Sequence, residues 1–457
     1  SLSTTRDDIT VDANGAITMT DARITGSGAV NIDGESSITF GPSTVINVDG
    51  SLGSNPLTIS AVGNLDLGNA DIDVQSNFNL DEALLIESTG GNIDFGTADI
   101  FYDATNTVDN SSVTIRANNS ILSAASDGNQ STFQNTLQFD GNTLIETTNG
   151  ALNLGDTSLV VEDVETSGSS LTMSAATNLD LGNSRLTVKG PTTLSSGGSA
   201  NLTSTIINST PSSNRDDVTI ESNGAITMSD ARLTGSGAVD IDGESTITFG
   251  PSTVISVDGF LGSNPLTISA VGNLDLGNAD IDVQSNFTLD EDLLIESTDG
   301  SINFGTADIF YNATNTGDNV SVTIRADQSI LSSSDDGNPA TFQNTLQFDG
   351  VTLIQATNGS LSLADSNLVV EDLETSGSSL TMSAATNLDL SNSRLTVKGP
   401  TTLTAGGSAN LASTIISSSL STTRDDITVD ANGAITMTDA RITGSGAVNI
   451  DGESSIT

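Results

Sequence analysis

Carboxylates are the side chains in this sequence that are best equipped to do chemistry. The chain has 58 Asp and Glu residues but no His and no Cys. Catalytic arrangements of the Ser–His–Asp or Cys–His type and thiol-bound zinc are therefore excluded, and phosphate-cradling glycine motifs are not seen. Two kinds of carboxylate chemistry remain open: acid–base cleavage of sugars by paired acids, and binding of calcium.

Calcium binding is the better supported of the two, because acids recur at equivalent positions of successive short repeats. Asp66 and Asp94 are expected to stack about 5 Å apart, where two carboxylates repel each other unless a cation or a proton lies between them. The predicted calcium ligands are Asp66, Asp73, Asp94, Asp99, Asp275 and Asp282.

A solvated acidic face is the interpretation that the sequence favours for the same residues, with calcium binding as the competing hypothesis. Asn303 stands opposite Asp275 where the earlier copy has Asp94, and an Asn beside an Asp relieves the repulsion without a metal. The calcium-binding nonapeptide GGxGxDxUx is also absent. No cofactor other than calcium is expected.

The charge balance restricts the partners. There are 12 basic residues against the 58 acidic ones, a formal charge of −46. Nucleic acid and anionic membranes are therefore not expected as partners, and no apolar run of about 18 residues predicts a membrane span.

Each of the ten Arg residues, such as Arg116 and its copy Arg325, is expected to pair with local acids.

The sequence repeats at two scales. Arg6 recurs as Arg215 and again as Arg424, an offset of 209 residues each time, and residues 1–39 are identical to residues 419–457. We therefore divide the chain into a repeat at 1–209, a close copy at 210–418 and the start of a further copy at 419–457. We therefore expect the chain to be a segment of a longer protein.

A shorter rhythm of apolar residues divides each repeat into eight coils of about 26 residues. The steps of the first column are 21, 27, 27, 29, 30, 28, 21 and 26 residues. The first column is Val11, Ile32, Ile59, Ile86, Ile115, Ile145, Met173 and Leu194, and the next copy starts at Ile220. The second is Ile17, Ile38, Leu65, Ile93, Ile121, Leu152, Leu179 and Leu202, and a later one includes Ile24, Val45, Ile72, Ile100, Leu159 and Leu186.

Between these columns, apolar and polar residues alternate with period two, as in Leu65-Asp66-Leu67, which predicts short strands. Asn and Gly at positions such as Gly63-Asn64 predict tight corners, and stacked Asn side chains are expected to form hydrogen bonds between coils. Three short strands per coil predict an all-β fold, a parallel and right-handed β-helix or β-solenoid. Residues 101–111 and 126–141 are expected to leave the coils as loops or to add short strands.

The alternating runs LTISAVGNLDL, GAITMTDARITGSGAVNIDG and SLTMSAATNLDLGNSRLTVKG resemble the filamentous-haemagglutinin group of secreted bacterial adhesins. Those are giant exported repeat proteins with β-helical shafts. The resemblance implies an extracellular or cell-surface location and a structural or adhesive role. The secretion motif NPNG of that group is absent, and a separately evolved surface solenoid fits the same pattern.

The sequence therefore predicts a structural shaft of a long fibre, serving as filament, stalk or matrix scaffold, rather than an enzyme. Near-identical coils leave no unique place for an active site. The expected partners are other copies of the chain or neighbouring repeats, with surface glycans as a further possibility. The alternatives are a carbohydrate-binding or carbohydrate-cleaving β-helix, and an adhesin stalk whose binding domain lies elsewhere.

Overall fold

Short β-strands make up all the regular structure of the described residues, among which there is no helix. The computed structural model describes residues 7–50, 56–76, 83–104, 111–125, 132–162, 169–209, 216–259, 265–285, 291–313, 320–333, 341–371, 377–418 and 425–457. The chain divides into two units, Ser1–Gly224 and Ala225–Thr457.

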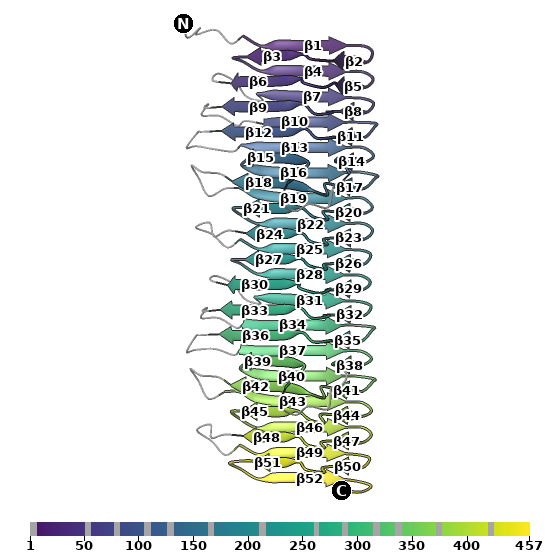
Figure 1. The fold of residues 1–457 in the computed structure, drawn as a ribbon, viewed down its shortest axis with the longest axis vertical. Coiled ribbons are helices and arrows are strands. Elements are labelled where there is room, and N and C mark those ends of the chain that lie inside the picture. Colours follow the sequence, from purple (N-terminus) through teal and green to yellow (C-terminus); the bar gives the residue numbers. More distant parts are fainter. Residues whose placement is uncertain are drawn as a thin grey trace. The chain divides into compact units, whose positions relative to one another are not determined.

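The strands of the first unit follow one another in threes, one for each of three parallel sheets, here named A, B and C (Figure 1). Sheet A contains β1 (Ile9–Ala13), β4 (Val30–Gly34), β7 (Leu57–Ala61), β10 (Ala83–Ser88), β13 (Ser112–Ala117), β16 (Asn142–Thr147), β19 (Ser170–Ala175), β22 (Thr192–Ser196) and β25 (Val218–Ser222). Sheet B contains β2 (Ile17–Met19), β5 (Ile38–Phe40), β8 (Leu65–Asp66), β11 (Ile93–Asp94), β14 (Ile121–Leu122), β17 (Leu152–Asn153), β20 (Leu179–Asp180) and β23 (Ala200–Asn201). Sheet C contains β3 (Arg23–Gly26), β6 (Val45–Gly50), β9 (Asp71–Ser76), β12 (Asp99–Ala104), β15 (Asn135–Asp140), β18 (Thr157–Glu162), β21 (Arg185–Val188) and β24 (Ile206–Ser209).

The second unit has the same three kinds of sheet. Its sheet A contains β28 (Val239–Gly243), β31 (Leu266–Ala270), β34 (Glu291–Ser297), β37 (Val320–Ala326), β40 (Val351–Ala356), β43 (Ser379–Ala384), β46 (Thr401–Ala405), β49 (Ile427–Ala431) and β52 (Val448–Gly452). Its sheet B contains β26 (Ile226–Thr227), β29 (Ile247–Thr248), β32 (Leu274–Asp275), β35 (Ile302–Asn303), β38 (Ile330–Leu331), β41 (Leu361–Ser362), β44 (Leu388–Asp389), β47 (Ala409–Asn410) and β50 (Ile435–Thr436). Its sheet C contains β27 (Arg232–Gly235), β30 (Val254–Gly259), β33 (Asp280–Ser285), β36 (Asp308–Ala313), β39 (Asn344–Asp349), β42 (Ser366–Glu371), β45 (Arg394–Val397), β48 (Ile415–Ser418) and β51 (Arg441–Thr443).

Strands of one sheet pair in parallel from each coil to the next, which confirms the predicted three-strand solenoid. In sheet A of the first unit, the first predicted column forms one unbroken series of paired residues from Val11 to Leu194 and on to Ile220. The steps between paired residues are therefore those predicted from the sequence. The right-handed winding stays a prediction.

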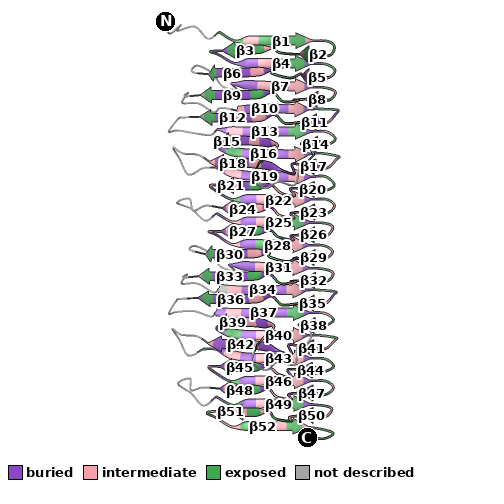
Figure 2. Ribbon diagram, in the orientation of Figure 1, coloured by how far each residue is buried: buried purple, intermediate pink, exposed green. Residues whose placement is uncertain are grey.

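The core of each unit lies between its three sheets and is built from the inward side of every strand. Ile59, Leu65, Leu67, Ile72 and Val74, which the sequence places inside one coil, are all fully buried. Buried and less buried residues alternate along the strands, as Figure 2 shows. Because each coil contacts mainly its two neighbours, stability comes from the stacking of coils.

Two predictions about register and one about a loop were wrong. Leu179 pairs with Ala200 and not with Leu202, and Ile24 pairs with Ile46 and not with Val45. Residues 135–140, expected in a loop or a short extra strand, form the regular sheet C strand β15. Corner hydrogen bonds decide the register of the short sheet B strands, because Asn178 Oδ1 accepts the backbone N–H of Ser199 immediately before Ala200.

The corners confirm the predicted Asn hydrogen bonds between coils, but the left-handed backbone lies at Gly68 and not at Gly63-Asn64. Asn64 Oδ1 accepts the backbone N–H of Asn92 at 3.0 Å, and Asn92 Oδ1 accepts that of Ser120 at 3.0 Å. Each such bond ties one coil to the next at the entry to sheet B. At the exit from sheet B, Gly68 has a φ of 59°, a left-handed backbone conformation that glycine adopts without steric cost.

Candidate functional site

The outward side chains of sheet B include the leading calcium candidates, Asp66 on β8 and Asp94 on β11. The two residues are paired across neighbouring coils, as predicted. Asp66 Oδ1 accepts the backbone N–H of Gly68 at 2.9 Å, and Asp94 Oδ1 accepts that of Gly96 at 2.9 Å. This is the Asx-turn arrangement, in which an Asp side chain closes a turn over the second following residue. Each carboxylate therefore has a structural task at its own corner.

In other coils, an Asn replaces one of the two acidic residues of the pair. Asn303 accepts the backbone N–H of Gly305 at 3.1 Å, so it makes the same turn, and its amide donates to Asp275 Oδ1 at 3.1 Å. Asn201 donates in the same way to Asp180 at 2.9 Å. At these positions the Asn amide therefore supplies a hydrogen-bond donor to the neighbouring Asp carboxylate, in place of a second negative charge.

The sheet C candidates do not gather around one point. Asp99 Oδ1 accepts the backbone N–H of Thr136 at 2.7 Å, where β15 begins. Asp73 is paired with Asn47 on one side and Phe101 on the other. Asp282, the copy of Asp73, likewise lies between Ser256 and Phe310.

Across the described ranges of the chain, no three acidic side chains are arranged to hold a metal ion. The structure brings together one predicted acidic pair, Asp66 with Asp94, while Asp275 is placed beside Asn303. Calcium binding at the Asp66 and Asp94 pair stays a prediction.

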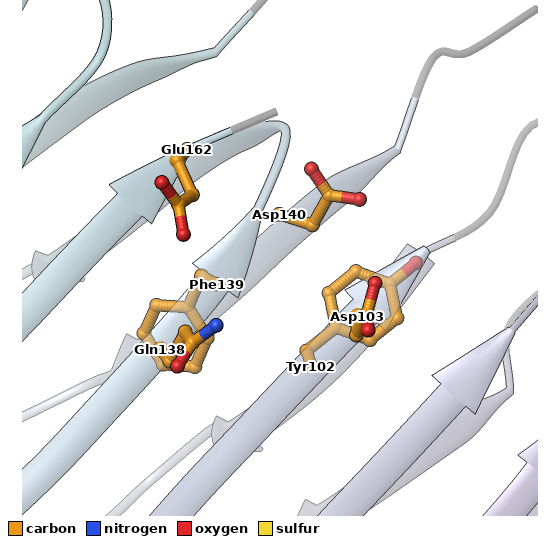
Figure 3. A pocket seen from close by; sticks show the side chains of 6 residues that line it. All are labelled: Tyr102, Asp103, Gln138, Phe139, Asp140 and Glu162. Atoms are coloured by element: carbon orange, nitrogen blue, oxygen red, sulfur yellow. The ribbon is translucent and has the colours of Figure 1, made fainter. Parts of the chain in front are cut away.

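A small cavity that the sequence did not predict lies at the ends of β12, β15 and β18. It has a volume of about 60 Å³ and is lined by Tyr102, Asp103, Gln138, Phe139, Asp140 and Glu162. Figure 3 shows the carboxylates of Asp103, Asp140 and Glu162 distributed along these three strand ends, with the rings of Tyr102 and Phe139 beside them. The volume is far below the roughly 300 Å³ at which small-molecule sites usually begin, but it has room for water.

The buried carboxylate in this region has a structural counterpart in the second unit. Asp140 and its copy Asp349 are each 6% exposed. Asp349 Oδ2 accepts the backbone N–H of Ala313 at 3.2 Å, which ties β39 to β36. The signal that the sequence offered was the alternation of apolar and polar residues in 137–140, which marks a strand rather than a loop. The pairing of β15 with β18 then places Asp140 beside Glu162.

Two arginines confirm the predicted pairing with local acids. Arg116 forms an ion pair with Glu146, and Arg325 forms one with Glu296 at 2.6 Å. In the register of sheet A, Arg116 lies between Glu87 and Glu146. Both arginine side chains are about half exposed, so each pair contributes little to stability.

Two other arginines contact phenylalanine rings, a role that the sequence did not reveal. The Arg185 guanidinium lies 5.9 Å from the centre of the Phe133 ring, and Arg394 lies 5.8 Å from that of Phe342. These are cation–π distances. Arg6, Arg215 and Arg424 lie outside the described residues.

No family model, no curated protein and no solved structure matches this chain. In the described part of the chain, no helix is long and apolar enough to cross a membrane.

Proposed function

We propose that this chain is a shaft segment of a long extracellular or cell-surface fibre. The observation that carries the proposal is the use made of the outward polar residues. The carboxylates and amides best placed for chemistry close turns within a coil or bond one coil to the next, as Asp66, Asn92 and Asn303 do. Outward side chains that hold the coils together in this way favour a structural role over a catalytic one.

Repetition supports the same function, because a solenoid grows by adding coils without a new kind of interface. The negative charge would also keep neighbouring fibres apart, since like-charged surfaces repel. The likeness to filamentous-haemagglutinin shafts and the extracellular location are part of this proposal.

Surface labelling of intact source cells tests the location. Antibodies raised against the purified chain are expected to bind cells that have not been permeabilised, in extended structures outside the cell envelope. Labelling that requires permeabilisation would contradict the proposal. A glycan array on the same protein tests the carbohydrate-binding alternative, and selective retention of one glycan class would favour it.

A further inference from the structure

Four Asn–Gly pairs lie in corners that follow a sheet A strand and stack on a preceding described coil. They are Asn149-Gly150, Asn223-Gly224, Asn358-Gly359 and Asn432-Gly433, and all four Asn residues are exposed. Asn is a thermolabile residue. It is most prone to deamidation before Gly, because no side chain hinders attack by the glycine backbone nitrogen on the Asn side chain. The reactivity of each pair then depends on what holds that nitrogen.

The four corners have two lengths. Residues 148–151 join β16 to β17, and residues 357–360 join β40 to β41. These corners are one residue longer than residues 223–225 after β25 and residues 432–434 after β49. The longer and the shorter corners therefore place their Asn–Gly pairs differently against the preceding coil.

In the shorter corners the preceding coil holds the glycine N–H. Gly224 N–H donates to Gly198 O at 2.8 Å, and Gly433 N–H donates to Gly407 O at 2.8 Å. Ser222 Oγ is a second acceptor for Gly224 N–H, at 3.2 Å. The nitrogen that would have to attack is thereby kept protonated and directed at the preceding coil.

In the longer corners the preceding coil accepts from the Asn backbone but not from the glycine. Asn149 N–H donates to Asn118 O at 2.9 Å, and Asn358 N–H donates to Asp327 O at 2.8 Å. Within the described ranges, no acceptor bonds the N–H of Gly150 or that of Gly359. The additional residue in the corner therefore leaves the attacking nitrogen unprotected.

We propose that Asn149 and Asn358 are sites of spontaneous deamidation, whereas Asn223 and Asn432 are protected. The glycine nitrogen loses its proton to solvent base and attacks the side-chain carbonyl carbon of the Asn, and the side-chain amide leaves as ammonia. The resulting succinimide takes up one water and opens to Asp or to isoaspartate, with no oxidant or reductant. This modification goes beyond the shaft function and does not depend on it.

The two reactive corners have different neighbours. Asn149 Nδ2 donates to Asn118 Oδ1 at 2.9 Å, whereas Asn358 Nδ2 donates to Asp327 Oδ1 at 2.7 Å. Deamidation of Asn358 therefore replaces a hydrogen bond to a carboxylate by the repulsion of two like charges. Deamidation of Asn149 places the new carboxylate beside an amide, which can turn its own N–H toward it. The contact between coils is thus weakened mainly at Asn358.

Peptide mapping by mass spectrometry, after incubation of the full chain at mildly alkaline pH, tests the proposal. The chain carries Asn14→Gln, because residues 7–39 and 425–457 are identical and would otherwise give the same peptides. In the folded chain, Asn149 and Asn358 are expected to deamidate about tenfold faster than Asn223 and Asn432, since each hydrogen bond at the glycine slows the step severalfold. In guanidinium chloride the four sites are expected to react at similar rates.

A matched variant tests the protection directly. Ser222→Ala removes one acceptor of Gly224 N–H and also the bond from Ser222 Oγ to Gly198 O at 2.6 Å. It is expected to raise the rate at Asn223 severalfold and to leave the rate at Asn149 unchanged. Equal rates at the four sites of the folded chain, or faster reaction at Asn223 and Asn432, would overturn the proposal.

The effect at Asn358 is tested with the product built in. Asn358→Asp is expected to lower the urea midpoint of unfolding, and adding Asp327→Asn is expected to restore it, because the second substitution removes the like charge. An unchanged midpoint for Asn358→Asp, or no recovery with Asp327→Asn, would overturn the predicted weakening of this corner.

Discussion

The acidic pair in sheet B gives a reciprocal prediction. Asp94→Asn converts the Asp66 and Asp94 pair into the arrangement seen at Asp275 and Asn303. The new Asn is expected to keep the hydrogen bond from Gly96 N–H, as Asn303 does from Gly305 N–H. Its amide would then donate to Asp66. We expect Asp94→Asn to stabilise the first unit and Asn303→Asp to destabilise the second.

The magnitude follows from two effects. Two unit charges about 5 Å apart repel by about 0.8 kcal/mol in water, which is the appropriate medium because both carboxylates reach the surface. The gained hydrogen bond adds about 0.5 to 1.5 kcal/mol. The expected change is therefore about 1 to 2 kcal/mol for each substitution, with opposite signs.

Urea unfolding at low salt in the presence of a chelator measures this change. The midpoint is expected to rise for Asp94→Asn and to fall for Asn303→Asp, with an unchanged slope. In 1 M salt the Debye length is about 3 Å, so the charge component should shrink and the hydrogen-bond component remain. A lower midpoint for Asp94→Asn under chelator would refute the reasoning.

Other substitutions test the core, the corners and the metal. Leu65→Ala should lower the free energy of unfolding by about 2 to 5 kcal/mol. Val62→Ala, at a residue that is 51% exposed, should change it by less than about 0.5 kcal/mol. Equal denaturation midpoints for the two variants would contradict the assignment of Leu65 to the core. Gly96→Ala should destabilise, because φ is 51° and the added Cβ would lie 2.1 Å from the carbonyl oxygen of Gly68, and an unchanged melting temperature would argue against this corner. The calcium hypothesis predicts that excess chelator lowers the melting temperature of the wild type but not of Asp94→Asn, and no shift in the wild type would exclude it.

The coil architecture was predictable because two independent signals agree. Period-two alternation defines which side chains face inward, and a slip by one residue would turn every inward side chain outward. The spacing of the first column then gives the number of residues per coil. Together they place Ile59, Leu65 and Ile72 in the core, where the structure has them.

Register in the shortest strands was not predictable from apolar residues alone. A two-residue strand such as Ala200–Asn201 has one inward position, and a small Ala there is less conspicuous than the nearby Leu202. The deciding contact is the hydrogen bond from Ser199 N–H to Asn178 Oδ1. In β6, Val45 and Ile46 are both apolar, and the bond from Val45 N–H to Ala22 O fixes which one faces inward.

The candidate site was predictable only in part. Equivalent positions in successive coils identified the Asp66 and Asp94 pair, because paired columns bring such residues side by side. The cavity at Tyr102 was missed because the stretch that lines it was interpreted as loop. The stacking of Arg185 on Phe133 joins residues far apart in the sequence, and nothing in local spacing indicates it.

The length of the molecule in solution tests the shaft account most directly. Eight coils at the strand spacing of about 4.8 Å should advance the chain by about 38 Å per 209-residue repeat. Small-angle X-ray scattering should therefore show that one additional repeat lengthens the maximum dimension by about 38 Å at constant cross-section. An increase shared between length and cross-section, as in a compact particle, would contradict it.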